Sequence, residues 1–265
     1  MKLVSITPKN GWEWMFEQPI AMCLTHLVQR YPEYKEMIKN RPENCYVILD
    51  NSIVELGESV SLQDILNAAD DVHANEIILR DAYPNGPRTI ERIKEDIQYL
   101  KDNNLIGKYK IMAVCHGENL EEFKQTFEFI NSTPEIDVIG IPKVLSKWVG
   151  ERSKLSNIFM NTNKQLHFLG SWYSLKELLD LPKNVWDKVR SCDTCLPSLY
   201  VIQNKHVWED RDGTIDLEKD YKELTKTKYN DILNEFNLNA NNIFDNPSTW
   251  LTDDERYFLF IENFN

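Results

Sequence analysis

The chain has 265 residues, of which 42% are hydrophobic and 27% are charged, a composition that excludes disordered and fibrous classes. Its formal net charge of −12 excludes proteins that coat nucleic acid through a broad basic face, although a local basic patch stays compatible with it. The chain has five cysteines, an odd number, and its N-terminal residues contain no apolar region as long as that of a signal peptide. Both observations indicate that the thiols are reduced. No apolar run approaches the roughly 20 residues that span a bilayer, so we expect a cytoplasmic protein, or one of the host cytoplasm if it is viral.

Short apolar runs recur along the first part of the chain, and each is followed by a polar stretch. Most are four or five residues long and rich in Val, Ile, Leu and Cys, which is typical of strands buried on both faces of a parallel sheet. The eight predicted strands are Leu3–Ile6, Ile20–Leu24, Tyr46–Leu49, Glu76–Leu79, Lys110–Val114, Asp137–Ile141, Leu166–Leu169 and Val189–Asp193.

The stretches between these runs have helical spacing. Ser61 is a predicted N-cap before a helix that places Leu62, Ile65 and Leu66 on one face. The same spacing predicts helices over 89–101, over 119–130 and after Ser174. Strands that alternate with helices predict an α/β protein with a parallel sheet. Eight such units favour a closed (β/α)₈ TIM barrel, which needs about 250 residues, over an open doubly wound sheet.

The alternation stops after Pro197. Residues 198–212 are mixed and predict a short strand or hairpin around Tyr200–Gln203, residues 216–236 predict a charged helix, and residues 241–265 are expected to pack across one end of the barrel. We therefore expect residues 1–200 to form the barrel core. Residues 201–265 would form a C-terminal helical extension packed on it, within a single domain overall.

Three aspartates directly follow apolar runs at the carboxyl ends of predicted strands. They are Asp50, Asp81 and Asp193. A carboxylate in such a place is unfavourable unless it is paired or used, and an ion pair with Arg80 or Arg190 would explain any one of them. Three aspartates at equivalent strand ends are better explained by one shared site than by three separate ion pairs. In glycosyl chemistry one carboxylate can attack the anomeric carbon, a second can move protons and a third can accept hydrogen bonds from a purine edge.

Six motifs in chain order resemble one enzyme family. They are Leu49-Asp50-Asn51-Ser52, Arg80-Asp81-Ala82-Tyr83-Pro84, Val114-Cys115-His116-Gly117, Ile139-Gly140-Ile141, Phe168-Leu169-Gly170 and Cys192-Asp193-Thr194-Cys195-Leu196-Pro197. The sequence resembles the tRNA-guanine transglycosylases, and more closely their short relatives that place 7-deazaguanines in DNA, many of them encoded by phages. The resemblance covers about the first 200 residues.

The resemblance assigns roles to these residues. It implies that Asp193 is the nucleophile and Asp50 the general acid/base. Asp81 and His116 would orient the base, and the backbone at Gly140 would line its pocket. The Leu169-Gly170 segment would cover the base.

The sequence also departs from the family. The zinc site is absent because no cysteine follows Cys195, and Asn51-Ser52-Ile53 replaces a Gly-Gly pair. Val54 falls where an aromatic residue usually stacks on the base, His116 replaces a glutamine, and Ser198 replaces an arginine. These departures bear on the tRNA substrate more than on the chemistry, so they favour DNA. We expect no metal and no cofactor. The spacing of Cys192 and Cys195 is interpreted as packing, because zinc needs four ligands.

The interpretation is a pentosyltransferase that exchanges guanine in nucleic acid for a free 7-deazaguanine base through a covalent aspartyl-glycosyl intermediate. Its partners would be DNA, or tRNA as the less favoured acceptor, and the free base. A protein partner, the oligomeric state and the identity of the 7-deazaguanine stay open. One alternative is a non-catalytic barrel that binds or sequesters a purine-like nucleobase or nucleotide. Another is an unrelated barrel lyase or hydrolase that uses the same carboxylates with Lys143.

Overall fold

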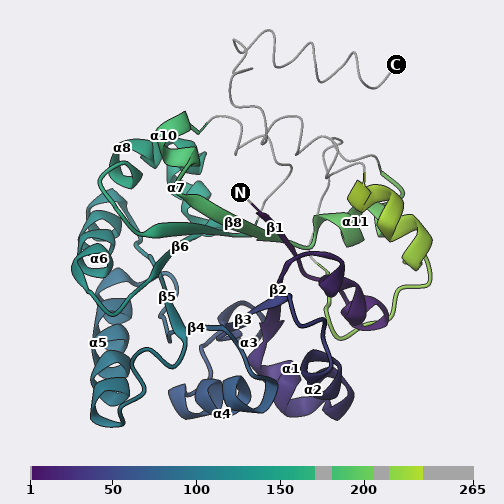
Figure 1. The fold of residues 1–265 in the computed structure, drawn as a ribbon. Helices are drawn as coiled ribbons and strands as arrows, with labels where there is room; N and C mark the ends of the chain where they lie inside the picture. Colours follow the sequence, from purple (N-terminus) through teal and green to yellow (C-terminus); the bar gives the residue numbers. More distant parts are fainter. Residues whose placement is uncertain (1, 171–180, 206–214, 235–265) are drawn as a thin grey trace, which may run out of the picture.

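Eight parallel strands close into a barrel in the computed structural model, which describes residues 2–170, 181–205 and 215–234 (Figure 1). Each strand pairs in parallel with the next, and β8 pairs with β1 to complete the ring. The strands are β1 (Lys2–Ser5), β2 (Ile20–Leu24), β3 (Tyr46–Asp50), β4 (Glu76–Ile78), β5 (Lys110–Val114), β6 (Val138–Pro142), β7 (Gln165–Leu169) and β8 (Val189–Thr194). The predicted (β/α)₈ barrel is confirmed.

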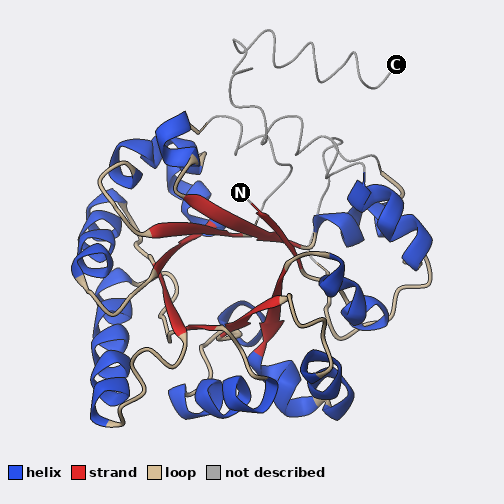
Figure 2. Ribbon diagram, viewed as in Figure 1, coloured by secondary structure: helices blue, strands red, loops and turns tan. Residues whose placement is uncertain are grey.

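Helices surround the barrel on its outside (Figure 2). The α-helices of six residues or more include α1 (Thr25–Arg30), α2 (Pro32–Lys39), α4 (Leu62–Val72), α5 (Gly86–Asp102), α6 (Leu120–Ser132) and α11 (Leu196–Gln203). The single-turn α-helices are α3 (Ile53–Leu56), α7 (Ser146–Val149), α8 (Ser156–Phe159) and α10 (Lys183–Trp186), and the 3₁₀ segments are η1 (Lys9–Glu17), η2 (Lys143–Leu145) and η3 (Arg152–Leu155). The described helices are not of a length and apolarity that would let them cross a membrane.

Side-chain caps begin two of the helices that the sequence predicts. Ser61 accepts a hydrogen bond from the Asp64 amide at the start of α4, and Asn119 accepts from the first amides of α6. The helix predicted after Ser174 lies outside the described residues.

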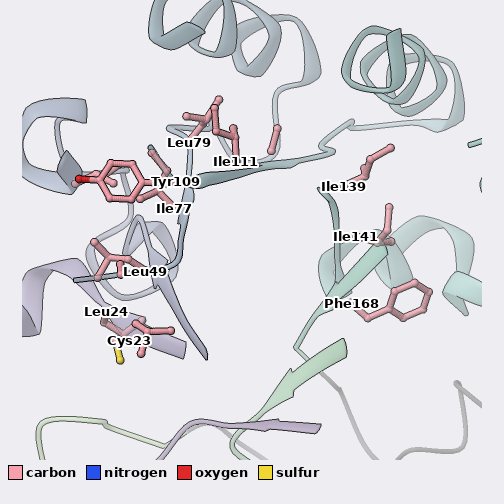
Figure 3. Close-up of a cluster of buried hydrophobic side chains, with 14 of the residues drawn as sticks. Cys23, Leu24, Leu49, Ile77, Leu79, Tyr109, Ile111, Ile139, Ile141 and Phe168 are labelled. Carbon is pink, nitrogen blue, oxygen red and sulfur yellow. The ribbon is translucent and has the colours of Figure 1, made fainter. Parts of the chain in front are cut away.

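The hydrophobic core has two layers because successive strand residues face opposite sides of the barrel wall. The outer layer packs the wall against the helices, and its strand residues, such as Leu49, Ile77, Ile111 and Ile139, point away from the barrel axis (Figure 3). The inner layer fills the barrel with Val4, Ile20, Met22, Ile48, Ile78, Met112, Val114 and Val138. The barrel interior is thus a packed core.

The region after Pro197 differs from the sequence prediction. The strand or hairpin expected around Tyr200–Gln203 is wrong, because these residues belong to α11. Its residues Leu196 to Val201 are all buried, and a short run that is apolar on every side fits a buried helix as well as a strand.

The helix predicted over 216–236 begins ten residues later than expected within the described part of the chain. Within 216–234 only residues 226–234 are helical, and there Tyr229 and Leu233 pack against Trp14 and Val201. The segment 241–265, expected to pack across the barrel, lies outside the described residues. The division into a core and an extension stays a prediction.

Candidate active site

The carboxyl ends of the strands bring the predicted aspartates together on one rim. Asp50 is the last residue of β3, Asp81 follows β4, and Asp193 lies near the end of β8. Since all strands are parallel, these ends lie at the same opening of the barrel. The negative charges of Asp81 and Asp193 both act on the carboxyl of Asp50, which places the three groups within electrostatic reach of one another.

Asp50 lies on a tightly held loop. Its Oδ1 accepts a hydrogen bond of 2.6 Å from the Ser52 amide, and its carbonyl accepts one of 2.6 Å from Thr25 Oγ1. Ser52 adopts a left-handed backbone with φ of 62°, which is uncommon for a residue with a side chain. Burial raises the pKa of Asp50 well above its usual range, and the carboxylate of Glu55 raises it further, although the Ser52 amide opposes both. The surroundings of Asp50 therefore favour its protonated form.

Asp81 and His116 form a buried pair. Asp81 Oδ2 lies 2.7 Å from His116 Nε2, while Oδ1 accepts hydrogen bonds from Asn51 Nδ2 at 3.1 Å and Ser59 Oγ at 2.9 Å. Both side chains are almost fully buried. Within the described residues His116 Nδ1 is buried without a hydrogen-bond partner. A buried polar atom without a partner is unfavourable, so this end of the His116 ring is a strained point of the pair.

Asp193 is held by two donors on one oxygen. His167 Nε2 and the Gly170 amide both lie 3.0 Å from Oδ1. Gly170 has a φ of 67°, and a Cβ there would lie 2.6 Å from Cδ of Lys143. A glycine is therefore required to direct this amide at Asp193. Among the described residues both of these donors bond Oδ1, which leaves Oδ2 for chemistry at the barrel mouth.

Gly140 and Leu169, predicted to line and cover a base, lie side by side. The Gly140 carbonyl accepts a hydrogen bond of 2.9 Å from the Cys115 amide, within the sheet. A Cβ at Gly140 would lie 2.8 Å from Cδ1 of Leu169. The missing side chain thus creates the space into which Leu169 reaches.

Three residues of the site have no role in the sequence prediction. Asn51 was seen only as a bulky substitute for glycine, yet its amide bonds Asp81 and the Leu79 carbonyl. His167, within β7, is the second such residue. It could have been found by alternation, because it lies two residues before Leu169 and therefore faces the barrel interior with it.

Arg152 is the third residue, and it gave no sequence signal because it lies in a polar segment. Its guanidinium is buried and donates to the carbonyls of Ile141 at 2.8 Å, Leu169 at 3.0 Å and Gly170 at 2.6 Å. It also lies over the ring of Phe168, 4.6 Å from the centroid. Arg152 therefore joins the carboxyl ends of β6 and β7 and fixes the segment that presents Gly170.

Aromatic and charged side chains border the aspartates. Tyr83 packs edge-on against His116 with centroids 5.7 Å apart, and its hydroxyl accepts a 2.9 Å hydrogen bond from Lys147. Desolvation by the surrounding rim raises the pKa of Glu55, an exposed residue, and the charge of Asp193 raises it further, while Lys143 opposes both. The rim thus offers an aromatic face beside cationic groups.

The arginines considered as structural partners of the aspartates bind other carboxylates. Arg80 donates to Asp96 with Nε at 2.7 Å, and Arg190 donates to Glu76 with Nη1 at 2.5 Å. Among the described residues no group of three or more His, Cys, Asp and Glu side chains is arranged to hold a metal ion.

Comparison with known proteins identifies the fold. No protein-family model and no curated protein sequence matches the chain. The YdjI aldolase from Escherichia coli K12 is similar in structure, with a TM-score of 0.54 and 10% identity over 91% of this chain and 90% of that one. An enolase protein from the Sargasso Sea environmental genome has a TM-score of 0.43 at 8% identity, over 72% of this chain and 53% of its own. The metallated homocysteine methyltransferase MmuM from Escherichia coli has a TM-score of 0.39 at 12% identity, over 69% and 77%.

At such identities the aldolase likeness shows a shared barrel and nothing about chemistry. The function of the chain must therefore follow from the side chains at its own barrel mouth.

Proposed function

We propose that this chain is a base-exchange glycosyltransferase that replaces guanine in nucleic acid, DNA in preference to tRNA, by a free 7-deazaguanine. The observation that carries the proposal is the arrangement of three aspartates on one rim in three different settings. In Asp193, Oδ1 accepts two hydrogen bonds and Oδ2 is left for the substrate. Asp50 has a raised pKa, and Asp81 is hydrogen-bonded to His116. These settings match a nucleophile, a proton carrier and a group that orients the base.

In the first step Oδ2 of Asp193 attacks the anomeric carbon with an electron pair. The bond from that carbon to N9 of guanine breaks, its electrons pass to N9, and protonated Asp50 supplies the proton. The sugar is then an ester of Asp193. The Oδ1 atom that accepts from His167 and Gly170 becomes the ester carbonyl.

In the second step the incoming base gives a proton to Asp50 as its nitrogen attacks the anomeric carbon. The ester bond breaks and its electrons return to Asp193. Two inversions retain the configuration, and the reaction consumes no cofactor. A group with a raised pKa suits both proton transfers, because it can be protonated in one step and restored in the next.

Recognition of the base is assigned to the buried pair of Asp81 and His116. The pair would accept and donate hydrogen bonds at the purine edge, and the exposed ring of Tyr83 beside His116 offers a stacking surface. In a duplex the target nucleotide would first have to leave the stack.

The test is incorporation of labelled base. Protein is incubated with radiolabelled guanine or 7-cyano-7-deazaguanine and with DNA or tRNA separately, beside Asp193→Ala and Asp50→Asn. Asp102→Asn serves as a control, because Asp102 is exposed on α5 and bonds only Gln98 among the described residues. We expect label in DNA with the wild type and the control, and a loss of about 1,000-fold or more with either aspartate variant.

The outcomes separate the candidate functions. Incorporation that survives in Asp193→Ala would contradict the proposed mechanism. No incorporation, together with tight binding of the free base that is lost in His116→Ala, would favour the sequestering barrel over the enzyme.

A further inference from the structure

Polar side chains run through the inside of the barrel and end at Asp193. Glu76 binds Arg190 through Nη1 at 2.5 Å and Nη2 at 3.0 Å, and Arg190 Nε lies 3.2 Å from Ser191 Oγ. Ser191 Oγ lies 2.7 Å from His167 Nδ1, and His167 Nε2 lies 3.0 Å from Asp193 Oδ1. We call Glu76, Arg190, Ser191, His167 and Asp193 the His167 chain.

Contacts with Tyr46 hold the first two members of the His167 chain, Glu76 and Arg190, in place. Glu76 is fully buried and also accepts a 2.7 Å hydrogen bond from the Tyr46 hydroxyl. The Arg190 guanidinium lies over the Tyr46 ring, 5.8 Å from its centroid. A guanidinium in this setting can only donate, so the Arg190 Nε proton points to Ser191. This proton constrains the direction of the next two hydrogen bonds, from Ser191 to His167 and from His167 to Asp193.

The direction of each hydrogen bond in the His167 chain limits the direction of the next. Since Ser191 Oγ accepts from Arg190 and keeps its own proton, it can donate that proton to His167 Nδ1, and the Asp193 carboxylate on the other side can only accept. The remaining proton of the neutral imidazole lies on Nε2 and points to Asp193 Oδ1. The opposite tautomer would bring a lone pair of Nε2 against a carboxylate oxygen that already accepts from the Gly170 amide, which is repulsive.

We propose that His167 is a positioning residue, held by Arg190 and Ser191 as the neutral tautomer with its proton on Nε2, which locks Asp193 with Oδ2 toward the substrate. Its effect on turnover depends on the proposed function, because that function makes Asp193 the nucleophile. In the covalent intermediate the same proton would bond the ester carbonyl and make Asp193 a better leaving group. His167 never touches the substrate in this scheme.

The tautomer can be measured without any activity. In protein labelled with ¹⁵N-histidine, the signals of His167 are assigned by their loss in His167→Gln; the chain has five histidines. We expect a protonated Nε2 and an unprotonated Nδ1 that accepts a hydrogen bond. In Ser191→Ala the Nδ1 signal should shift. In Ser5→Ala, an equally buried serine that bonds Tyr229 instead, it should not. A protonated Nδ1, or no response to Ser191→Ala, would overturn the proposal.

Turnover gives the second readout. We expect His167→Leu to lower kcat for base exchange by about 10–100-fold with KM for the free base little changed. His167→Gln should recover much of that loss, because its amide can donate from nearly the same place. Equal kcat in the two variants would contradict positioning through Nε2. If the wild type shows no base exchange, the proposed function is contradicted. The NMR measurement then still shows which nitrogen of His167 carries the proton.

Discussion

Asp50 lies where its own charge is unfavourable, because burial and Glu55 raise its pKa above that of an aspartate in the unfolded chain. As the pH rises, the unfolded state ionises first, so the wild type loses stability from about pH 4 up to the native pKa of Asp50. Asp50→Asn removes this effect while keeping an acceptor for the Ser52 amide. We expect the variant to melt above the wild type at about pH 8 and close to it at about pH 4, measured by thermal unfolding at both values. An equal difference at both pH values would contradict the raised pKa.

Gly170 combines a left-handed backbone with a close neighbour. Gly170→Ala would place a Cβ 2.6 Å from Cδ of Lys143 and move the amide that holds Asp193. We expect a loss of about 1–2 kcal/mol in the free energy of unfolding, together with a fall in exchange activity.

Gly107→Ala is the matched control for this change. Gly107 has a φ of 85°, and a Cβ there would meet nothing within 4 Å. This variant should show the loss in unfolding free energy without the loss in activity, measured by urea unfolding and base exchange. Similar activity in both variants would show that the Gly170 amide is not needed.

At the scale of elements, α5 fixes the end of β4 that carries Asp81. The fully buried carboxylate of Asp96 on α5 accepts from the Arg80 amide at 3.0 Å and from Arg80 Nε at 2.7 Å. Asp96→Asn keeps the shape but removes the charge that balances the guanidinium. We expect a loss of about 2–3 kcal/mol in unfolding free energy and a raised KM for the base. Asp102→Asn on the same helix should stay within about 0.5 kcal/mol of the wild type, and an equal loss there would contradict the pairing.

The strands could be predicted because short apolar runs such as Tyr46–Leu49 alternate with stretches of helical spacing, and that alternation favours a buried parallel sheet. Helix starts were equally accessible at Ser61 and Asn119, since a cap acts within one turn. The prediction failed at Tyr200–Gln203 because a short buried helix and a buried strand are both apolar throughout.

The same reasoning explains which residues of the candidate site could be predicted from the sequence. Asp50, Asp81 and Asp193 follow apolar runs, and a charge in such a place is visible in the sequence. Arg152 and Asn51 act through backbone carbonyls and a neighbouring aspartate that only the folded chain brings near. Contacts between distant segments have no local pattern in one sequence.

At the scale of the molecule, a segment from beyond residue 214 is joined to the first strand. Tyr229 is fully buried, and its hydroxyl lies 2.5 Å from Ser5 Oγ on β1. Tyr229→Phe removes only this bond, and we expect it to cost about 1 kcal/mol in unfolding free energy. Tyr229→Ala also leaves a void beside Trp14 and should cost about 3–5 kcal/mol. Denaturant unfolding measures both, and equal losses would show that the ring contributes nothing beyond its hydroxyl.

The His167 chain gathers its last three members on adjacent strands, and this has a consequence for substitutions at the site. Ser191, His167, Asp193 and the Gly170 amide all lie between positions 165 and 194, whereas Asp50, Asp81 and His116 belong to strands encoded earlier in the gene. Under the proposed function, a substitution at Asp81 or His116 would alter recognition of the base and leave the short segment that holds Asp193 unchanged.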